Sequence, residues 1–270
     1  MDKVLIIGGN SLLSREICFF EENLSSDVFC TIHKNAENVP NSSKIVTLKE
    51  AKQYAFERIY IIAANIPYGQ FEEVTDSLIT TNVCLPQEVS DSFPDAKLIY
   101  SSSIAVFGNQ KTVTSTSPLL PCEAYGFSKA AAEVIVKKHS RFSVLRLPSL
   151  YGEGVENGFV NRIIKQAKDK EITIYGNGER TQAYVNYKTA AEMLVKMGHE
   201  EKSEVLNCIL EAPVSNIFIA KSLREKDPSI NIKFTGEDNS SSVTFEVINS
   251  GNNYNLSTFE SITSYIKNNL

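Results

Sequence analysis

Val4-Leu-Ile-Ile-Gly8-Gly9-Asn10-Ser11-Leu12-Leu13-Ser14 joins an apolar run to a turn of small residues and the start of a helical pattern. A dinucleotide-binding fold needs small residues at such a turn, because the backbone must approach a pyrophosphate at a helix N-terminus. The usual spacing is Gly-x-x-Gly-x-x-Gly, and here Gly8 is followed by Ser11 and Ser14 at the other two positions. The stretch predicts a cofactor loop formed by Gly8, Asn10, Ser11, Leu12 and Leu13. The alternative is an ordinary strand–turn–helix start with Asn10 or Ser11 as the N-cap.

Strand-like and helical patterns alternate through the first half of the chain. Apolar runs of strand length occur at 4–7, 28–32, 45–48, 59–63, 98–101 and 144–147, and helical patterns at 12–23, 51–56, 71–93 and 124–139. Near-continuous apolar strands are typical of a parallel sheet that helices cover on both faces. Because the crossovers are right-handed, we expect an α/β fold with a doubly wound parallel sheet, a Rossmann domain, over residues 1–150. Pro86 lies inside the 71–93 pattern, so it must be near a helix start or a break.

The pattern changes after Tyr151. Short strands and helices alternate there with polar turns, which predicts a small mixed C-terminal lobe over residues 151–270. Strands are expected at 171–175, 231–234 and 242–247, and a terminal helix at 258–268. We expect elements from about 184–210 to join the first domain, and the lobe to bind the substrate.

Composition excludes several classes of partner. Of the 270 residues 42% are apolar and 22% are charged, as in ordinary soluble proteins, and the net charge of −5 argues against nucleic acid or an anionic membrane surface. No run approaches the ~18 apolar residues of a membrane span. The N-terminus has no signal-peptide layout, and the five scattered cysteines form no C-x-x-C pair, so we expect a cytoplasmic protein with reduced thiols. The three histidines are far apart, and no metal site is predicted.

Tyr125-Gly-Phe-Ser-Lys129 places a phenol and an ammonium four residues apart on a predicted helix. Such positions lie on one helix face with Cβ atoms ~5–6 Å apart. A nearby cation favours the phenolate and lowers a pKa that starts near ~10, which makes the phenol a proton donor and acceptor near neutral pH. Ser101-Ser102-Ser103 ends the apolar run at 98–101, and a serine hydroxyl there would polarise a carbonyl. Together these groups predict hydride transfer between a carbonyl or alcohol and a nicotinamide.

Two further strand ends bear on the cofactor. The run at 28–32 ends in His33-Lys34, with no acid before Glu37 to accept a bond from a ribose 2′-hydroxyl, so a cationic end favours NADP(H) while NAD(H) stays possible. The alternative is a solvated lysine on a loop. Ala63 and Ala64 end another strand, where small side chains let a cofactor lie close or simply pack in the core. Asn82 lies on a predicted buried helix, and we expect it to have a structural role.

The order of the motifs carries a resemblance to a known family. The segments IIGGNSLLS, IIAAN, TTNV, SSSIAVFG, YGFSK, LRLPSLYGEG and IYGNGERTQAYV follow one another as in the extended short-chain dehydrogenase/reductases, in their sugar-nucleotide epimerase/dehydratase branch. The resemblance runs from about Val4 to the predicted strand at 205–210, and more weakly beyond.

The resemblance implies roles for individual residues. Ser103 would lie next to the substrate carbonyl, Tyr125 would be the acid/base, and Lys129 would contact the cofactor ribose and tune Tyr125. Further cofactor contacts are implied for Ser101 and Leu147. For the nucleotide sugar, the resemblance implies contacts from Ser149 and Arg180. Relatives often have Asn at the position of Ser149. Relatives also commonly have an Arg-Asp pair just after the position of Arg180, where this chain has Gln182 and Ala183. The alternative for Arg180 is a solvated side chain after a turn.

Where this chain differs from the family's sequence motifs, some of the family's reactions are excluded. Related 4,6-dehydratases have an Asp-Glu pair directly after the Ser103 position, and C3/C5 epimerases have a cysteine in that region, whereas this chain has Ile104-Ala105. The reaction that remains is oxidation or reduction of a single sugar carbon. The cationic strand end favours NADPH-dependent reduction of a 4-keto sugar nucleotide, and the alternative is an NAD-dependent 4-epimerase. A third hypothesis is a non-catalytic NADP(H)-binding regulator, which the altered glycine loop favours and which Ser103, Tyr125 and Lys129 oppose.

The resemblance also implies a homodimer and a place in polysaccharide biosynthesis. Relatives pair the Tyr-x-x-x-Lys helix and the preceding long helix into a four-helix bundle between subunits. Ala130, Ala131 and Ala132 would suit such a close helix contact. The alternative is that these alanines pack against the chain's own sheet.

Overall fold

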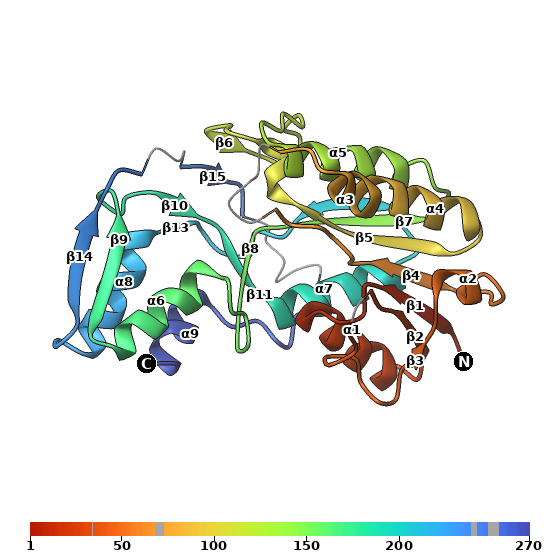
Figure 1. The fold of residues 1–270 in the computed structure, drawn as a ribbon, viewed down its shortest axis with the longest axis horizontal. Coiled ribbons are helices and arrows are strands. Elements are labelled where there is room, and N and C mark those ends of the chain that lie inside the picture. Colours follow the sequence, from red (N-terminus) through yellow and green to blue (C-terminus); the bar gives the residue numbers. More distant parts are fainter. Residues whose placement is uncertain (34, 68–72, 239–241, 248–253) are drawn as a thin grey trace. The chain divides into compact units, whose positions relative to one another are not determined.

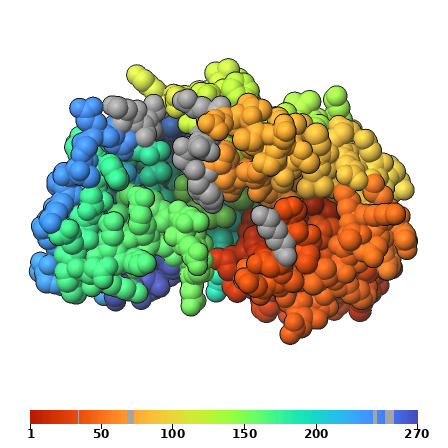
Figure 2. Space-filling model, in the orientation of Figure 1, coloured from red at the N-terminus to blue at the C-terminus, as the bar shows by residue number. Residues whose placement is uncertain are grey.

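The structure is a computed structural model that describes residues 1–33, 35–67, 73–238, 242–247 and 254–270. Two compact units are present. Unit 1 consists of residues 1–108, 118–147 and 190–207, and unit 2 of residues 109–117, 148–189 and 208–270. The N-terminal residues of unit 1 are red to orange in Figure 1 and Figure 2, and the C-terminal residues of unit 2 are blue.

Unit 1 is built on a parallel sheet of seven strands in the order β12-β7-β5-β4-β1-β2-β3. The strands are β1 (Lys3–Ile7), β2 (Asp27–Thr31), β3 (Lys44–Ile45), β4 (Arg58–Ile61), β5 (Lys97–Ser103), β7 (Phe142–Leu147) and β12 (Glu204–Asn207). The chain runs from β1 outward to β3 and then returns to the other side of β1 at β4, so the strand order reverses between β1 and β4. Ligands of such sheets bind at the carboxyl ends of the strands at this reversal. The predicted doubly wound α/β fold is confirmed.

Helices lie on both faces of this sheet (Figure 1). One face carries α1 (Leu12–Asn23) and α7 (Tyr187–His199), and the other carries α3 (Asp76–Ile79), α4 (Leu85–Ser92) and α5 (Ala124–Val136). A π-helical turn, η1 (Thr80–Cys84), joins α3 to α4, and Pro86 lies in the first turn of α4, directly after this turn. The expectation that Pro86 marks a helix start or break is confirmed.

The expected strand at 45–48 is wrong at its C-terminal half. β3 ends at Ile45, and Leu48 is already the first residue of the short helix α2 (Leu48–Ala51). This helix takes the place of the one expected at 51–56, and it begins and ends earlier in the chain. Thr47 is the N-cap of α2, and Thr47 and Glu50 form a reciprocal capping box. Those hydrogen bonds satisfy the free backbone groups of a helix start, so they decide the conformation over the β-branched run Ile45-Val46-Thr47.

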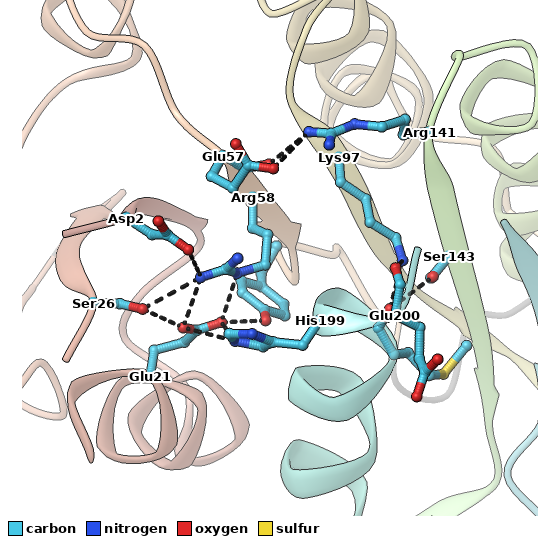
Figure 3. Close-up of polar contacts among 12 residues, drawn as sticks. Asp2, Glu21, Ser26, Glu57, Arg58, Lys97, Arg141, Ser143, His199 and Glu200 are labelled. Atoms are coloured by element: carbon cyan, nitrogen blue, oxygen red, sulfur yellow. Dashed lines mark hydrogen bonds and ion pairs between the residues drawn. The ribbon is translucent and has the colours of Figure 1, made fainter. Parts of the chain in front are cut away.

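A buried ionic cluster ties α1, β4 and α7 together (Figure 3). Glu21 on α1 is fully buried and accepts hydrogen bonds from the Tyr60 hydroxyl (2.5 Å) and from Arg58 Nε (3.2 Å) on β4. His199 at the end of α7 places Nε2 3.2 Å from a Glu21 carboxylate oxygen. Nearby, the buried Lys97 on β5 donates to the carbonyl oxygens of Met197 (2.6 Å) and Glu200 (2.5 Å) at the C-terminus of α7.

Unit 2 is a mixed α and β lobe whose strands pair two by two. The pairs are β6 (Thr112–Val113) with β15 (Thr244–Phe245), β8 (Ser149–Tyr151) with β11 (Tyr184–Asn186), β9 (Glu171–Tyr175) with β14 (Asn231–Thr235), and β10 (Thr181–Gln182) with β13 (Val214–Ser215). Its core includes buried residues of α6 (Phe159–Lys168), α8 (Asn216–Lys226) and α9 (Ile262–Asn268). The predicted mixed lobe is present. Among the described residues, no helix has the length and apolar character needed to cross a bilayer.

Candidate active site

The turn between β1 and α1 has no room for side chains at its two glycines. Gly8 has φ +92°, and a Cβ atom there would lie 2.7 Å from the Ala63 backbone nitrogen. A Cβ atom on Gly9 would lie 2.7 Å from Cys30 Cβ. The turn therefore packs tightly between the neighbouring strand ends, as a cofactor loop at the reversal of strand order requires.

Ser11 and Ser14 replace the usual glycines with specific hydrogen bonds. Ser11 Oγ accepts from Ser14 N (3.0 Å) and is the N-cap of α1, and Ser14 Oγ donates to the Gly8 carbonyl oxygen (2.8 Å). Of the two N-caps considered from the sequence, Ser11 is the one found. The bond from Ser14 closes the turn on itself, so the altered fingerprint keeps an ordered loop at the start of α1.

Asn10 holds the segment that follows β2. Its side-chain oxygen accepts from Asn38 N (2.9 Å), its backbone oxygen accepts from Asn38 Nδ2 (3.1 Å), and its amide contacts Asn35. His33 is exposed in the same segment, and Lys34 lies outside the described residues. Sequence reasoning missed Asn35 and Asn38, because neither belongs to a motif with fixed spacing.

Asn82 connects the segment after β4 to α5. Its buried side chain accepts from Asn65 N (2.7 Å) and donates to the Asn65 carbonyl oxygen (2.9 Å) and to Ser128 Oγ (3.0 Å). Ser128 Oγ in turn donates to the Tyr125 carbonyl oxygen (2.7 Å). The expected structural role of Asn82 is confirmed. Ala63 and Ala64 precede Asn65 directly, and Ala63 N donates to the Ile7 carbonyl oxygen (2.8 Å), so this segment runs beside the β1–α1 turn.

Ser103 and Tyr125 belong to elements that are in close contact. Ser103 ends β5, and its Oγ accepts from Ala105 N (3.2 Å) as the N-cap of the short 3₁₀ helix η2 (Ile104–Phe107). A Cβ atom on Gly126 would lie 2.5 Å from the Ala105 carbonyl oxygen. Glycine at position 126 thus lets the first turn of α5 pack on η2, which brings the half-buried Tyr125 to the end of β5.

Lys129 lies one turn below Tyr125 and is 2% exposed. Its Nζ donates to the Ser101 carbonyl oxygen (2.9 Å), and it lies 4.8 Å from the centre of the Tyr100 ring and 5.9 Å from that of Tyr125. Burial lowers the pKa of Lys129 to about 7, against the opposing attraction of Glu133. The structure therefore brings the predicted Ser101, Ser103, Tyr125 and Lys129 together around the end of β5.

Leu147, Ser149 and Arg180 are placed in two different units. Leu147 ends β7 of unit 1 and is buried. In unit 2, Ser149 begins β8 and is exposed, and Arg180 lies just before β10. The Arg180 Nε atom and the Tyr184 hydroxyl are buried and have no hydrogen-bond partner among the described residues.

Arg180, Arg162 and Tyr184 interact electrostatically within unit 2. Burial raises the pKa of Tyr184, and the charges of Arg180 and Arg162 oppose that rise. Sequence reasoning missed Arg162 and Tyr184, although Arg162 is one of three basic residues of α6, with Lys165 and Lys168. Within the described part of the chain, no three His, Cys, Asp or Glu side chains are placed to hold a metal ion.

The model of the NAD dependent epimerase/dehydratase family matches residues 4–208. The chain belongs to this family. The predicted resemblance to extended short-chain dehydrogenase/reductases of the epimerase/dehydratase branch is thereby confirmed, as is the expectation that the chain is an enzyme of this type. No curated protein sequence matches the chain.

Solved structures of epimerases and dehydratases share the fold of this family member. A UDP-glucuronic acid 4-epimerase from Bacillus cereus, in complex with UDP-glucuronic acid and NAD, has a TM-score of 0.83 at 18% identity over 99% of this chain and 97% of that one. A UDP-N-acetylglucosamine 4-epimerase from Methanobrevibacter ruminantium M1 has a TM-score of 0.83 at 17% identity over 99% and 96%. An NAD-dependent NDP-hexosamine 5,6-dehydratase involved in tunicamycin biosynthesis has a TM-score of 0.84 at 18% identity over 100% and 96%. At these identities the likeness establishes the fold.

Proposed function

We propose that this epimerase/dehydratase family member is an NAD-dependent enzyme that inverts C4 of a nucleotide-activated sugar. The observation that carries the proposal is the arrangement of Ser103, Tyr125 and Lys129 at the end of β5, with Lys129 buried against Ser101 and beside the Tyr125 ring. Two of the similar structures are 4-epimerases of UDP-sugars, and one of them holds NAD. They support the 4-epimerase alternative better than the reduction of a 4-keto sugar that the sequence favoured.

The residues of unit 1 fit a dinucleotide. Gly8 and Gly9 present backbone without side chains at the carboxyl end of β1, and the N-terminus of α1 directs the positive end of its dipole to the same turn. Lys129, with three donors, has only one acceptor among its described contacts, the Ser101 carbonyl oxygen, so it can donate to a ribose hydroxyl as well. A bound nicotinamide would supply the acceptance and return of a hydride.

The protein's own groups then move the proton. The Tyr125 phenolate takes the proton of the C4 hydroxyl. It returns this proton after the sugar ring has presented its other face to the cofactor. The Lys129 ammonium stabilises that phenolate, and the Ser103 hydroxyl donates to the C4 oxygen. The sugar is oxidised and reduced once in each turnover, so no net oxidant is consumed.

NADPH-dependent reduction of a 4-keto sugar nucleotide is a second candidate function. The exposed His33 and the absence of an acid in the sequence between the end of β2 and Glu37 favour a cofactor with a 2′-phosphate. Lys34, the other cation of this strand end, lies outside the described residues. In this reaction Tyr125 donates its proton to the new alkoxide, and one NADPH is consumed per product.

Two measurements separate the candidates. Nucleotide extracted from the purified protein is identified by mass spectrometry, and UDP-glucuronic acid, UDP-N-acetylglucosamine and their 4-keto derivatives are then assayed as substrates. A 4-epimerase interconverts C4 isomers with catalytic NAD and no lasting absorbance change at 340 nm. Stoichiometric loss of NADPH with a 4-keto sugar would instead establish the reductase. Cofactor binding without turnover of any nucleotide sugar would favour the non-catalytic regulator and overturn both enzyme proposals.

We also propose that the protein forms a homodimer through α5. Phe127 and Val134 are 58% and 51% exposed, and Ala131 between them is exposed as well. The three positions are four and three residues apart, so they form one apolar stripe along the helix. Ala132, by contrast, packs in the core of unit 1. Of the three alanines considered from the sequence, Ala132 thus lies in the chain's own core, Ala131 lies on the exposed side of α5, and Ala130 is half-buried.

A further inference from the structure

The three consecutive serines at the end of β5 each serve a different partner. The Ser101 carbonyl oxygen accepts from Lys129 Nζ (2.9 Å), and Ser103 caps η2. Ser102 Oγ donates to a carboxylate oxygen of Glu133 (2.7 Å). The motif that holds Lys129 and Ser103 therefore also binds a buried acid that has no part in the proposed proton transfer.

Glu133 is held by more donors than Ser102 alone. It lies on α5 four residues after Lys129, it is fully buried, and Arg146 on β7 binds both of its oxygens through Nε (2.9 Å) and a terminal nitrogen (2.8 Å). Arg146 is itself fixed, because its guanidinium lies 5.0 Å from the centre of the Phe107 ring and contacts Asn207 (3.4 Å). The bidentate pair with Arg146 and the bond from Ser102 therefore fix the position of the Glu133 carboxylate.

We propose that Glu133 is a positioning residue for the reaction, and that its carboxylate, clamped by Arg146 and Ser102, keeps Lys129 in its ammonium form beside Tyr125. The inference rests on the proposed function, since it gives Lys129 the task of stabilising the Tyr125 phenolate. Glu133 itself touches neither Tyr125 nor the proposed substrate position in any described contact. It acts through Lys129 alone.

The groups around Lys129 show why an anion is needed there. Tyr100 from β5 and Tyr125 from α5 present their rings, and Ser101 presents a carbonyl oxygen. Burial raises the pKa of Tyr100 well above its ordinary value, so Tyr100 stays neutral. Arg146 and Lys137, the cations near Glu133, are both paired with its carboxylate. Of the described residues, Glu133 is the carboxylate whose charge acts on Lys129.

Burial and the charge of Glu133 change the pKa of Lys129 in opposite directions. Burial lowers the pKa of Lys129 to about 7, and Glu133 raises it. The ammonium is present below that pKa and is lost as the pH rises through it. Without the negative charge of Glu133, the loss begins at a lower pH, and the phenolate of Tyr125 loses its stabilising cation near neutrality.

The test is the pH profile of Glu133→Gln, which keeps the shape and most hydrogen bonds of the side chain but removes its charge. We expect the alkaline limb of kcat/KM for the nucleotide sugar to move to lower pH, since removing a nearby opposite charge lowers the pKa of an ammonium group. Glu133→Asp keeps the negative charge, so the alkaline limb of this variant is expected to lie close to that of the wild type. Ser102→Ala loosens the same clamp without removing the charge, so it should lower thermal stability and leave the limb in place.

A measurement without turnover separates this inference from the proposed function. Titration of the lysine 13Cε signals by NMR, with Lys129 assigned by Lys129→Met, reports the Lys129 pKa directly. A lower Lys129 pKa in Glu133→Gln than in the wild type supports the inference even if no nucleotide sugar reacts. Equal Lys129 pKa values in the two proteins overturn it, whatever the activity. Should Glu133→Gln fail to fold, a Glu133→Asp profile displaced as far as 1 unit would overturn it as well.

Discussion

A Cβ atom on Gly126 would meet the Ala105 carbonyl oxygen at 2.5 Å. The Gly126→Ala substitution must therefore push the first turn of α5 away from η2, and with it Tyr125 away from Ser103. We expect a loss of about 1–3 kcal/mol in unfolding free energy, as for other overpacked sites, and a lower kcat. Thermal denaturation and steady-state kinetics measure the two effects. An unchanged Tm together with an unchanged kcat would show that α5 does not need this close approach.

Tyr125 carries the proton in the proposed reaction, so removing its hydroxyl alone is a direct test. Tyr125→Phe is expected to lower kcat about 10²- to 10⁴-fold, the usual contribution of a positioned acid or base. Cofactor binding should be retained, because Lys129 and the β1–α1 turn are untouched. Turnover of the nucleotide sugar and NAD binding by fluorescence are the measurements. A variant with more than half of the wild-type kcat would remove Tyr125 from the mechanism.

Among single residues, those in motifs could be located from the sequence, and those defined by a tertiary partner could not. Tyr125 and Lys129 lie four residues apart on a helix, so their proximity was predictable from spacing, and the family resemblance singled out Ser103 at the strand end. Ser14 seemed to weaken the glycine loop, yet its hydroxyl closes the turn onto Gly8. That bond depends on the path of the turn, which spacing does not specify.

At the scale of elements, Glu21 joins helices from distant parts of the chain to one strand. Burial raises the pKa of Glu21, but hydrogen bonds from His199, Ser26 and Tyr60, and the charge of Arg58, outweigh burial and hold the pKa at about 2. Because this value is below the ordinary 4.5, the ionised form stabilises the folded state above pH 4.5. This stabilisation is about 3 kcal/mol and is lost as the pH falls from 4.5 toward 2.

Glu21→Gln should remove this stabilisation. We expect the variant to be less stable than the wild type by about 3 kcal/mol at pH 7, and the difference to shrink steadily below pH 4.5. Urea unfolding at pH 7 and at pH 3 measures the free energies. A difference that stays constant across this range would mean that shape, and not charge, explains the role of Glu21.

The central strands β1, β2, β4, β5 and β7 were predictable because they are buried on both faces and are therefore largely apolar, whereas the edge strand β3 is exposed. The strand predicted at 45–48 was partly wrong, because the β-branched residues of this run favour a strand whereas Thr47 and Glu50 cap a helix. That capping signature is present in the sequence and could have been used. The contact of Glu21 with His199 spans 178 residues, so only the finished packing of α1 against α7 defines it.

At the scale of the whole molecule, the apolar stripe of Phe127, Ala131 and Val134 predicts self-association. We expect two copies per particle for the wild type and one for Phe127→Glu, because a charge in a helix interface is costly to bury. Light scattering after size exclusion measures the mass of each. Tyr175→Glu is the matched control, since Tyr175 is equally exposed (59%) but lies on β9 of unit 2. A wild type that is monomeric at every concentration, or a Phe127→Glu variant that stays dimeric, contradicts the proposal.

The chain passes between its two units at residues 108, 117, 147, 189 and 207. Synthesis on the ribosome proceeds from the N-terminus, so β12 and the end of α7 emerge after all the rest of unit 1. Until then the nascent sheet lacks its edge strand β12, Glu21 lacks His199, and Lys97 lacks the carbonyl groups to which it donates. Unit 1 therefore cannot be completed early in translation, and a chain truncated near residue 150 would form an open sheet in which the buried Lys97 lacks its carbonyl partners, while Glu21 keeps Arg58 and Tyr60.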